Sequence, residues 1–523
     1  MLKSYLIMNY IDRMFSEQTF NTTTEKVKSV LLSVSTQHVL VLSSLCALVV
    51  ETLIQEVDKD RIVAYVFFNS GISTLLQSWI GSRLPLILAP SLDFLIPALA
   101  LLSAQSGEND RIKVKGMAVV AGMVQLAVGL TGLVGFALGH CGPLVLAPLL
   151  CILGFSIYRE AALFCSDHWG MAALAVVLLV ILSQHLHYFL RLSAFSVCKR
   201  LSVSQIKVFW GNGIFSFFCF DLYVSCVLSA PALPLLSGKS IAAGVAAGLS
   251  SSISSPAVYV VAARLLKAPV APAHACNRGL CVDGLGSVLS GLMGAPAGMC
   301  SSVPNACVIG LSQSGSRSSV QLAGVLLLIL GVSPQLAQMV CSVPLAIHGA
   351  VLSVTYTLSV ATGITYFQHA DVDSGRNIFN IGFTVFMSLA LPRWFRLHSN
   401  FIQTGVPSVD VFLRSLLTLP VLFVGVLAFL LEHTVSGTLP ERGLARHEGT
   451  KKILSLADLQ QGYSHSPNMV YDPPPLVMKV LDLRGLRSVP FCACRSPPVE
   501  EVVVTVPEMS SLLPDKDAAV SSS

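Results

Sequence analysis

Two apolar stretches of this chain are interrupted at matching places. The first reads Ala89-Pro90-Ser91-Leu92-Asp93-Phe94-Leu95-Ile96-Pro97, and the second reads Cys300-Ser301-Ser302-Val303-Pro304-Asn305. Each belongs to the third apolar segment of its half of the chain, 86–104 and 300–316. Inside a bilayer, open backbone is tolerated only where protein or a water-filled cavity satisfies its polar groups. Paired interruptions of this kind indicate the substrate site of a transporter.

The composition is that of a helical protein that crosses the membrane many times. The chain has 523 residues, of which 53% are hydrophobic and 12% charged, and its mean hydropathy is +0.72. A soluble chain carries about 25% charged residues. The net charge of +5 is small for this length and does not suggest nucleic acid as a partner. Basic residues before the first and after the last apolar segment favour cytoplasmic locations for both termini.

Apolar segments of membrane-spanning length follow one another along most of the chain. Seven precede the loop at 231–240 and seven follow it: 29–50, 61–80, 86–104, 116–139, 143–162, 168–190 and 208–230, then 241–263, 279–295, 300–316, 318–342, 344–366, 377–392 and 409–432. Residues 1–28 form a polar arm, and residues 433–523 have the composition of a mostly disordered tail. The expected fold class is therefore an all-α polytopic membrane protein with fourteen segments.

The first interrupted segment carries a carboxylate, Asp93, in the middle of a span. A charge at that depth is costly and by default functional. The alternative is an Asp that only caps the half-helix after Pro90. The neighbouring Phe94 either packs in the core or stacks on a planar substrate.

The second interrupted segment offers polar side chains without charge. Asn305 and Gln313 each present a donor and an acceptor, which match the edge of a purine or pyrimidine. Ser302 and Ser312 add hydroxyls. Such residues are also common between packed transmembrane helices, but the interruption at Pro304-Asn305 favours a binding site. The free N–H groups of the half-helix that starts there attract electron-rich oxygens.

Other polar residues within the spans have simpler explanations. The pair Gln37-His38 in the first segment is best explained by hydrogen bonds between helices, although His38 is also a candidate proton relay. The serines of 250–255 are typical of close helix packing or of a Na⁺ site built from hydroxyl and carbonyl oxygens. Asp283, Asp371, Asp373, Arg278 and Arg376 are placed near segment ends as caps or interfacial salt bridges.

Enzymatic and metal-binding motifs are missing from the sequence. It contains no P-loop, no Gly-x-Ser-x-Gly elbow and no His-Glu-x-x-His. Fourteen cysteines are scattered without ligand spacing and are interpreted as small buried hydrophobes. We therefore expect neither an enzyme, a metal site nor a cofactor.

Several blocks of sequence resemble the nucleobase–ascorbate transporter family. They include Gly81–Leu86, Ala89–Pro97, His274–Gly279, Ser302–Asn305, Asp373–Asn377 and Glu441–Leu444, which occur in family order. Cys141–Pro148, His168–Gly170 and Ser183–Leu186 resemble more narrowly one vertebrate branch, within solute carrier family 23.

The resemblance implies an inverted repeat of seven plus seven segments, with short strands in segments 3 and 10. It also implies a core domain that moves against a gate domain, in a homodimer. The expected boundaries are 1–28 for the cytoplasmic arm, 29–139 and 241–342 for the core domain, 140–240 and 343–432 for the gate domain, and 433–523 for the cytoplasmic tail.

The resemblance also assigns roles to single residues. The family's Gln-His of segment 1 falls on Gln37 and His38, and its segment-3 aromatic falls on Phe94. Its segment-8 Glu aligns with Ser254 and its segment-9 Asp with Ser290, so both carboxylates are replaced. The family signature reads here from Pro304 to Gln313, with Cys307 and Ser312 in place of the usual Gly and Thr.

The function expected from residues and resemblance together is secondary transport of a purine base of the hypoxanthine and xanthine class, coupled to Na⁺, at the plasma membrane. Asp93 is expected to supply the missing charge, and Asp93, His38 and Gln37 to take part in ion coupling. Ascorbate is the alternative substrate. Loss of the carboxylates at Ser254 and Ser290 leaves a second class open, a sensor or interaction protein that binds but does not transport.

Overall fold

The computed structural model describes most of the apolar part of the chain. Described are residues 22–53, 59–102, 108–185, 234–312, 314–332, 335, 342–398, 401–438, 441–442, 471–474 and 477–478. Within these residues six helices are long and apolar enough to cross a membrane, or seven if the bent pair Pro407–Thr418 and Pro420–Thr434 counts as one span. The chain is therefore a multi-pass helical membrane protein. The expected seventh segment, 208–230, lies outside the described residues.

The described helices follow the apolar segments closely. In the first half they are α2 (Thr22–Leu53), α3 (Lys59–Trp79), α4 (Leu92–Leu102), α5 (Glu108–Thr131), α6 (Leu133–His140), α7 (Pro143–Phe155), α8 (Tyr158–Ser166), α9 (Trp169–Val180) and the π-helix η2 (Ile181–His185). In the second half they are α12 (Gly238–Leu265), α13 (Ala273–Met293), α14 (Val303–Ser312), α15 (Arg317–Val332), α17 (Leu345–Phe367), α18 (Gly375–Leu397), α19 (Pro407–Thr418) and α20 (Pro420–Thr434).

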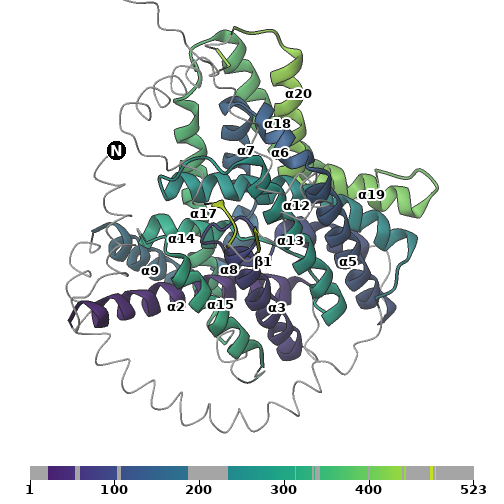
Figure 1. Cartoon of the computed structure of the whole chain (residues 1–523). Helices are drawn as coiled ribbons and strands as arrows, with labels where there is room; N and C mark the ends of the chain where they lie inside the picture. Colours follow the sequence, from purple (N-terminus) through teal and green to yellow (C-terminus); the bar gives the residue numbers. More distant parts are fainter. Residues whose placement is uncertain are drawn as a thin grey trace, which may run out of the picture.

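The two interrupted segments each contain a short strand before a half-helix, as the resemblance implies. Strand β1 (Leu88–Pro90) pairs antiparallel with β2 (Met299–Ser301), with Ala89 opposite Cys300. Both strands are buried near the centre of the molecule, surrounded by helices (Figure 1). The pairing satisfies backbone groups that a membrane interior would leave without partners. It also brings together two segments that lie far apart in the sequence.

Three expected spans contain breaks that the apolar pattern alone does not reveal. Gly132, with φ of +78°, separates α5 from α6. A two-residue turn, 156–157, separates α7 from α8. Helices α19 and α20 meet at an angle of 73°, where Pro420 begins α20. Proline at the first helical position starts a new helix because it lacks the N–H that continues the previous one.

Close helix contacts rely on glycine. A Cβ added to Gly284 in α13 would lie 2.8 Å from the Gly122 carbonyl oxygen in α5, and one added to Gly248 in α12 would lie 2.8 Å from the Ala121 carbonyl oxygen. Helix α17 approaches α7 in the same way at Gly363 and Gly154. Small residues let helix backbones approach closely in a bilayer. Two sets of packed helices result, one around α5, α12 and α13 and the other around α7 and α17.

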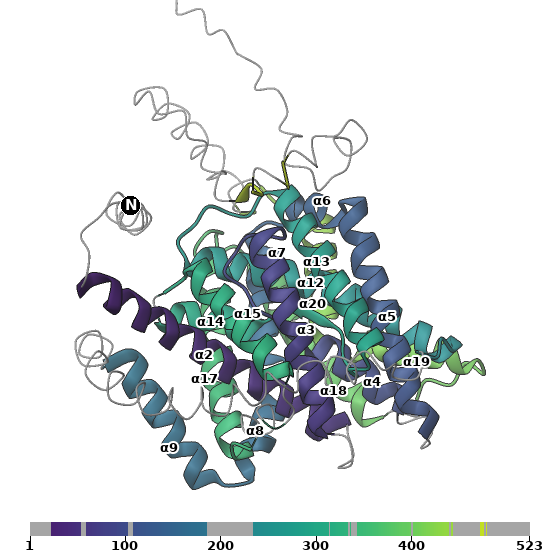
Figure 2. The same cartoon turned by 60° about the horizontal axis from the view of Figure 1, so that its bottom comes forward.

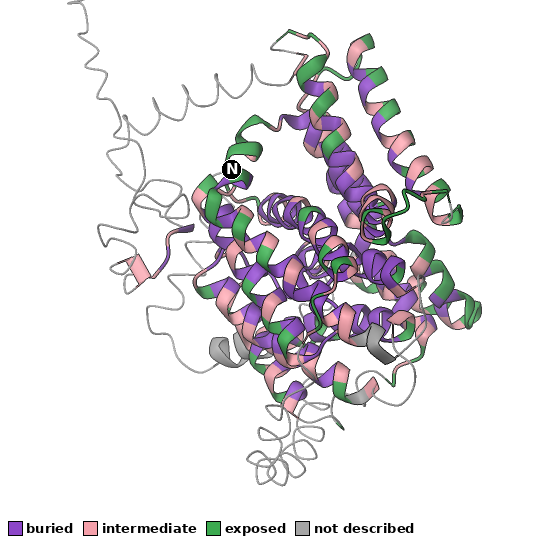
Figure 3. Ribbon diagram, turned by 90° about the vertical axis from the view of Figure 1, so that its right-hand side faces the viewer, coloured by how far each residue is buried: buried purple, intermediate pink, exposed green. Residues whose placement is uncertain are grey.

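Burial follows this packing. Buried residues concentrate in the middle of the molecule, and the outward faces of peripheral helices carry exposed ones (Figure 3). Many of the exposed residues are large and apolar, such as Trp169 and Leu174 on α9, and Phe379 and Phe386 on α18. Large exposed apolar surfaces mark contact with a membrane or a partner. The division into core and gate domains stays a prediction.

Candidate functional site

A small cavity lies where the two interrupted segments meet α2, α12, α7, α17 and α20. Its volume is ≈ 20 Å³. One water occupies about 10–15 Å³ by this measure, so the conformation has no room for a nucleobase. The polar residues of its lining are Ser91, Asp93, Ser156, Ser254, Ser301, Ser302 and Tyr356.

Asp93 is the carboxylate of this cavity. It lies in the first turn of α4 and is 5% exposed. Its Oδ1 accepts a hydrogen bond from the Ser250 hydroxyl of α12, and its Oδ2 accepts one from the Ser91 hydroxyl at 3.2 Å. Within the described residues no cationic side chain forms a salt bridge with it. The carboxylate is therefore held by neutral hydroxyls and faces the cavity.

Ser254 lines the same cavity, one helical turn beyond Ser250. Its hydroxyl donates to the Ser250 carbonyl oxygen at 3.2 Å. The resemblance gives Ser254 as the position where the family carries a glutamate. The structure thus brings the extra carboxylate of segment 3 to the wall where the replaced one would stand. The expectation that Asp93 and Ser254 share a site agrees with this placement, and their roles stay a prediction.

Asn305 lies behind the cavity wall and is fully buried. Its Nδ2 donates to the Ser302 hydroxyl at 2.9 Å, and its Oδ1 lies 3.1 Å from His38 Nδ1. Ser302 itself lines the cavity. The amide is thus fixed by α2 on one side and by its own half-helix on the other. In this conformation Asn305 does not line the cavity itself, and its amide is bonded to Ser302, which does.

Besides Asn305 and His38, four of the predicted site residues lie apart from the cavity lining. Phe94 is fully buried among apolar side chains beside Gly298. Gln37 is exposed on the surface of α2. Ser290 donates to the Ala297 carbonyl oxygen at 2.6 Å, and Ser312 donates to the Val308 carbonyl oxygen at 2.7 Å. Their roles in substrate or ion binding stay predictions, and Gln313 lies outside the described residues.

A second buried carboxylate was missed by sequence reasoning. Asp283 was placed near a segment end, but it lies in the middle of α13 and is 0% exposed. Its Oδ2 accepts from the Tyr259 hydroxyl at 3.0 Å and from the Ser301 hydroxyl at 3.3 Å. Gln77 donates in turn to the Tyr259 oxygen at 3.1 Å.

Asp283 is a buried carboxylate close to the positions where Ser254 and Ser290 replace the carboxylates of the family. Ser301 connects Asp283 to the cavity that contains Asp93. Helix α13 therefore keeps a buried carboxylate although Ser290 carries none. The signal was available in the sequence, because Asp283 stands ten residues inside a helix that begins at Ala273. The predicted apolar segment, 279–295, starts later in the sequence than helix α13 does, so Asp283 was placed near a segment end.

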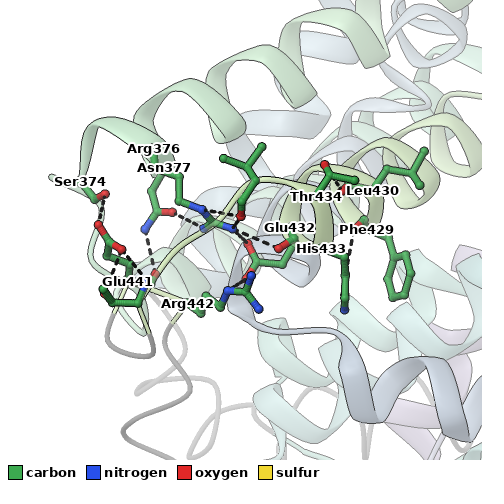
Figure 4. A network of polar contacts seen from close by, with 12 residues as sticks. Ser374, Arg376, Asn377, Phe429, Leu430, Glu432, His433, Thr434, Glu441 and Arg442 are labelled. Carbon is green, nitrogen blue, oxygen red and sulfur yellow. Dashed lines mark hydrogen bonds and ion pairs between the residues drawn. The ribbon is translucent and has the colours of Figure 1, made fainter.

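Arg376 was expected in a salt bridge near a segment end, and this is confirmed. Its guanidinium lies 3.0 Å from Glu432 Oε2, and both side chains are less than 10% exposed. Figure 4 shows how the start of α18 and the end of α20 meet there. Asn377 donates to the Glu441 carbonyl oxygen at 2.8 Å, so the block 373–377 meets Glu441, the first residue of the block 441–444.

A larger cavity lies at the opposite ends of these two helices, where the second half of α18 and the start of α20 meet α7 and α8. Its volume is ≈ 280 Å³, and it shares Ser156 with the small cavity. Arg159, Arg393 and Arg396 line it. The Arg396 guanidinium lies 3.7 Å from Glu160.

Comparison with known sequences agrees with this architecture. Residues 29–397 match the model of the Xan_ur_permease group, a permease family. The mouse protein solute carrier family 23 member 3 is 40% identical over 441 residues, which cover 74% of this chain and 72% of that protein. Rat solute carrier family 23 member 1 is 30% identical and covers 76% of each chain. Nucleobase-ascorbate transporter 3 of Arabidopsis thaliana is 26% identical over 398 residues, which cover 69% of this chain and 72% of that protein.

The polar residues of the small cavity lie within the matched residues, between two interrupted spans of a permease. The chain belongs to the nucleobase–ascorbate transporter family, as do the members of solute carrier family 23 that it resembles. Among solved structures, the transmembrane domain of a cyanobacterium bicarbonate transporter is similar, with a TM-score of 0.42 and 15% identity, over 76% of this chain and 97% of that one.

Proposed function

We propose that this chain is a secondary transporter of a purine nucleobase, of the hypoxanthine and xanthine class, coupled to Na⁺ at the plasma membrane. The observation that carries the proposal is the buried Asp93 carboxylate, which faces the meeting point of two interrupted spans. Within the part of the chain that the structure describes, it is bonded to hydroxyls alone. An ionised carboxylate is costly to bury without a partner. Asp93 is therefore suited to bind an N–H group of a base or a Na⁺ ion.

The polar wall opposite Asp93 supports a purine as the ligand. Ser302 supplies a hydroxyl at the start of α14, and Asn305 stands directly behind it. When the hydrogen bond from Asn305 to Ser302 opens, the amide can offer a donor and an acceptor to one edge of the base. A carboxylate and an amide on facing segments bracket a planar ring more specifically than either does alone.

Transport requires movement, because the cavity is too small for a base in this conformation. The cavity lies between the set of helices around α5, α12 and α13 and the set around α7 and α17. We propose that these sets are the core and gate domains of a fourteen-segment inverted repeat, and that they separate to admit substrate. The larger cavity at Ser156 is the proposed route of entry, where Arg393 and Arg396 attract electron-rich oxygens of an oxopurine.

Uptake measurements test the proposal. Cells that express the chain are given labelled hypoxanthine, xanthine, urate, uracil or ascorbate, with and without Na⁺, and the surface amount of the protein is measured in parallel. Saturable uptake of an oxopurine that falls when Na⁺ is removed is expected. Absence of saturable uptake of any base, despite normal surface expression, overturns the proposal.

Ascorbate is a second candidate, because the cavity wall is rich in hydroxyls at Ser91, Ser254 and Ser302. Saturable uptake of ascorbate that purines do not inhibit would identify ascorbate as the substrate. A sensor or interaction protein is separated from both by binding without uptake. Thermal stabilisation of the purified protein by a purine, in the absence of transport, is the result that favours the sensor.

A further inference from the structure

A short piece of the C-terminal tail lies against the transmembrane part of the molecule. Residues 471–474 read Tyr-Asp-Pro-Pro, within the stretch whose composition predicts mostly disorder. Tyr471 is 0% exposed, and Pro473 is buried as well. Figure 2 shows this piece at the upper edge of the molecule, beside the start of α13. A tail tyrosine that is fully buried indicates a specific contact.

Hydrogen bonds join the hydroxyl of Tyr471 to a loop and its carbonyl oxygen to a helix. Its hydroxyl donates to the Pro269 carbonyl oxygen, between α12 and α13, at 2.6 Å. Its carbonyl oxygen accepts from an Nη of Arg278 in α13 at 2.7 Å. The Nε of the same guanidinium donates to the Ile80 and Gly81 carbonyl oxygens, at 2.6 and 2.9 Å. Arg278 therefore connects the tail to the chain that leaves α3.

Asp472 contacts the same loop from the other side. Arg83, which has a φ of +57°, donates to the Asp472 carbonyl oxygen. The Asp472 carboxylate also attracts Arg83 and His274 electrostatically. The Arg83 carbonyl oxygen accepts from Arg317 at the start of α15 at 2.7 Å. The negatively charged Asp472 of the tail thus lies beside a surface that carries the positive charges of Arg83 and Arg278.

We propose that Arg83, Arg278 and the Pro269 carbonyl form a binding site for a tyrosine-acidic-proline peptide, and that residues 471–474 of this chain are its resident ligand. The peptide fits by three features. The ring of Tyr471 is buried, its hydroxyl finds an acceptor, and two arginines bind consecutive carbonyl oxygens. Three prolines follow Asp472 in the sequence, and they limit the entropy that the segment loses on binding.

The bound tail is positioned to support the substrate cavity. Arg83 lies in the loop that leads from α3 into β1, and β1 ends at Pro90 in the cavity wall. The hydrogen bonds of residues 471–474 to the helical part reach this loop, the α12–α13 loop and α13. They do not reach α17, α18, α19 or α20, so the segment does not tie the two sets of helices together. It acts as a clamp on one set, and its release is expected to loosen β1.

Two truncations of the purified protein test this proposal without any assumption about substrate. One ends after Val470 and removes the clamp, and the matched control ends after Met478 and keeps it. The first is expected to unfold at a lower temperature than the full chain, and the control at the same temperature. A synthetic peptide of residues 468–478, added to the shorter protein, is expected to restore the lost thermal stability.

Direct binding gives a second measurement. A fluorescent peptide of residues 468–478 is expected to bind the shorter protein saturably, and a Tyr471→Ala peptide at least tenfold more weakly. In the full chain, Tyr471→Ala should lower the melting temperature as the truncation does, whereas Tyr463→Ala, elsewhere in the tail, should not. Equal melting temperatures of the two truncations, together with absence of peptide binding, overturn the proposal.

Discussion

Two buried carboxylates, Asp93 and Glu432, illustrate opposite uses of the same chemical group. Each residue is 5% exposed. Glu432 Oε2 lies 3.0 Å from Arg376, and its Oε1 lies 3.8 Å from Arg442. Asp93 accepts hydrogen bonds from the hydroxyls of Ser91 and Ser250 and has no salt bridge within the described residues. The first carboxylate has its counter-charges built into the chain, and the second does not.

The difference separates a structural role from a binding role. Burial of a charge is tolerated when the attraction of a partner offsets the free energy of hydration that the charge loses. Glu432 meets that condition, since it joins the end of α20 to the start of α18. Asp93 meets it only when something else enters the cavity: a cation, a proton or an N–H group of a substrate. The comparison therefore predicts that changes at Asp93 affect transport, and that changes around Glu432 affect folding.

The largest expected effect is that of Asp93→Asn. The substitution keeps shape and removes charge, so uptake or its Na⁺ dependence should be lost while the protein still reaches the surface. Ser252→Ala is the matched control, because among the described residues that hydroxyl bonds only to the Gly248 carbonyl oxygen of its own helix. Uptake and surface amount are measured together. Normal uptake by Asp93→Asn, with unaltered Na⁺ dependence, reduces Asp93 to a helix cap and removes the contrast with Glu432.

A change at Arg376 tests the other half of the comparison. Arg376→Gln leaves Glu432 partly unpaired, and removal of one partner from a buried pair costs about 3–5 kcal/mol of stability. The melting temperature and the surface amount should fall, and the transport rate of each remaining molecule should change little. The double variant with Glu432→Gln should recover part of the loss. A stable Arg376→Gln protein that fails to transport would place this pair in the transport cycle instead.

The fold was largely predictable from apolar segments and their interruptions. The matching breaks at Pro90 and Pro304 predicted that two half-helices meet. Interrupted backbone in the middle of a membrane is tolerated only where protein surrounds it and satisfies its polar groups. The bend at Pro420 was less visible, since the apolar run continues through it. The expected seventh segment falls outside the described residues, so the number of spans stays a prediction.

The candidate site was predictable in part. Asp93 was found because a lone carboxylate stands out among apolar neighbours, and Ser302 because it precedes a half-helix. Asp283 was wrongly placed near a segment end, because the apolar segment that contains it starts later than the helix does. The bond between Asn305 and His38 was not foreseen, because contacts between distant helices depend on packing that one sequence does not reveal. The buried Tyr471 was missed for the same reason.

Asn305→Ala sharpens the comparison on the uncharged side of the cavity. The substitution leaves Ser302 and His38 without their shared partner, and an unsatisfied buried polar group costs about 1–3 kcal/mol. If the amide also reads the base, the apparent affinity for substrate should fall about tenfold or more, since 1.4 kcal/mol equals a factor of ten. Affinity is measured by concentration-dependent uptake, and stability by thermal unfolding. Unchanged affinity in a destabilised variant makes Asn305 a structural residue like Glu432.

The smallest expected effect concerns Glu441, a half-buried carboxylate of the same cluster as Glu432. The Thr438 N–H, together with the hydroxyls of Thr438 and Ser374, lowers the pKa of Glu441 below its usual 4.5. A carboxylate whose pKa is lower in the folded state stabilises the fold above the unfolded value, and that contribution is lost as pH falls through the folded pKa. Glu441→Gln should therefore lower the melting temperature slightly at pH 7, and the difference from the unmodified protein should vanish in acid. Thermal unfolding at a series of pH values in detergent measures it. A difference that is constant with pH contradicts the charge-based explanation and assigns the effect to the shape of the turn between Thr438 and Glu441.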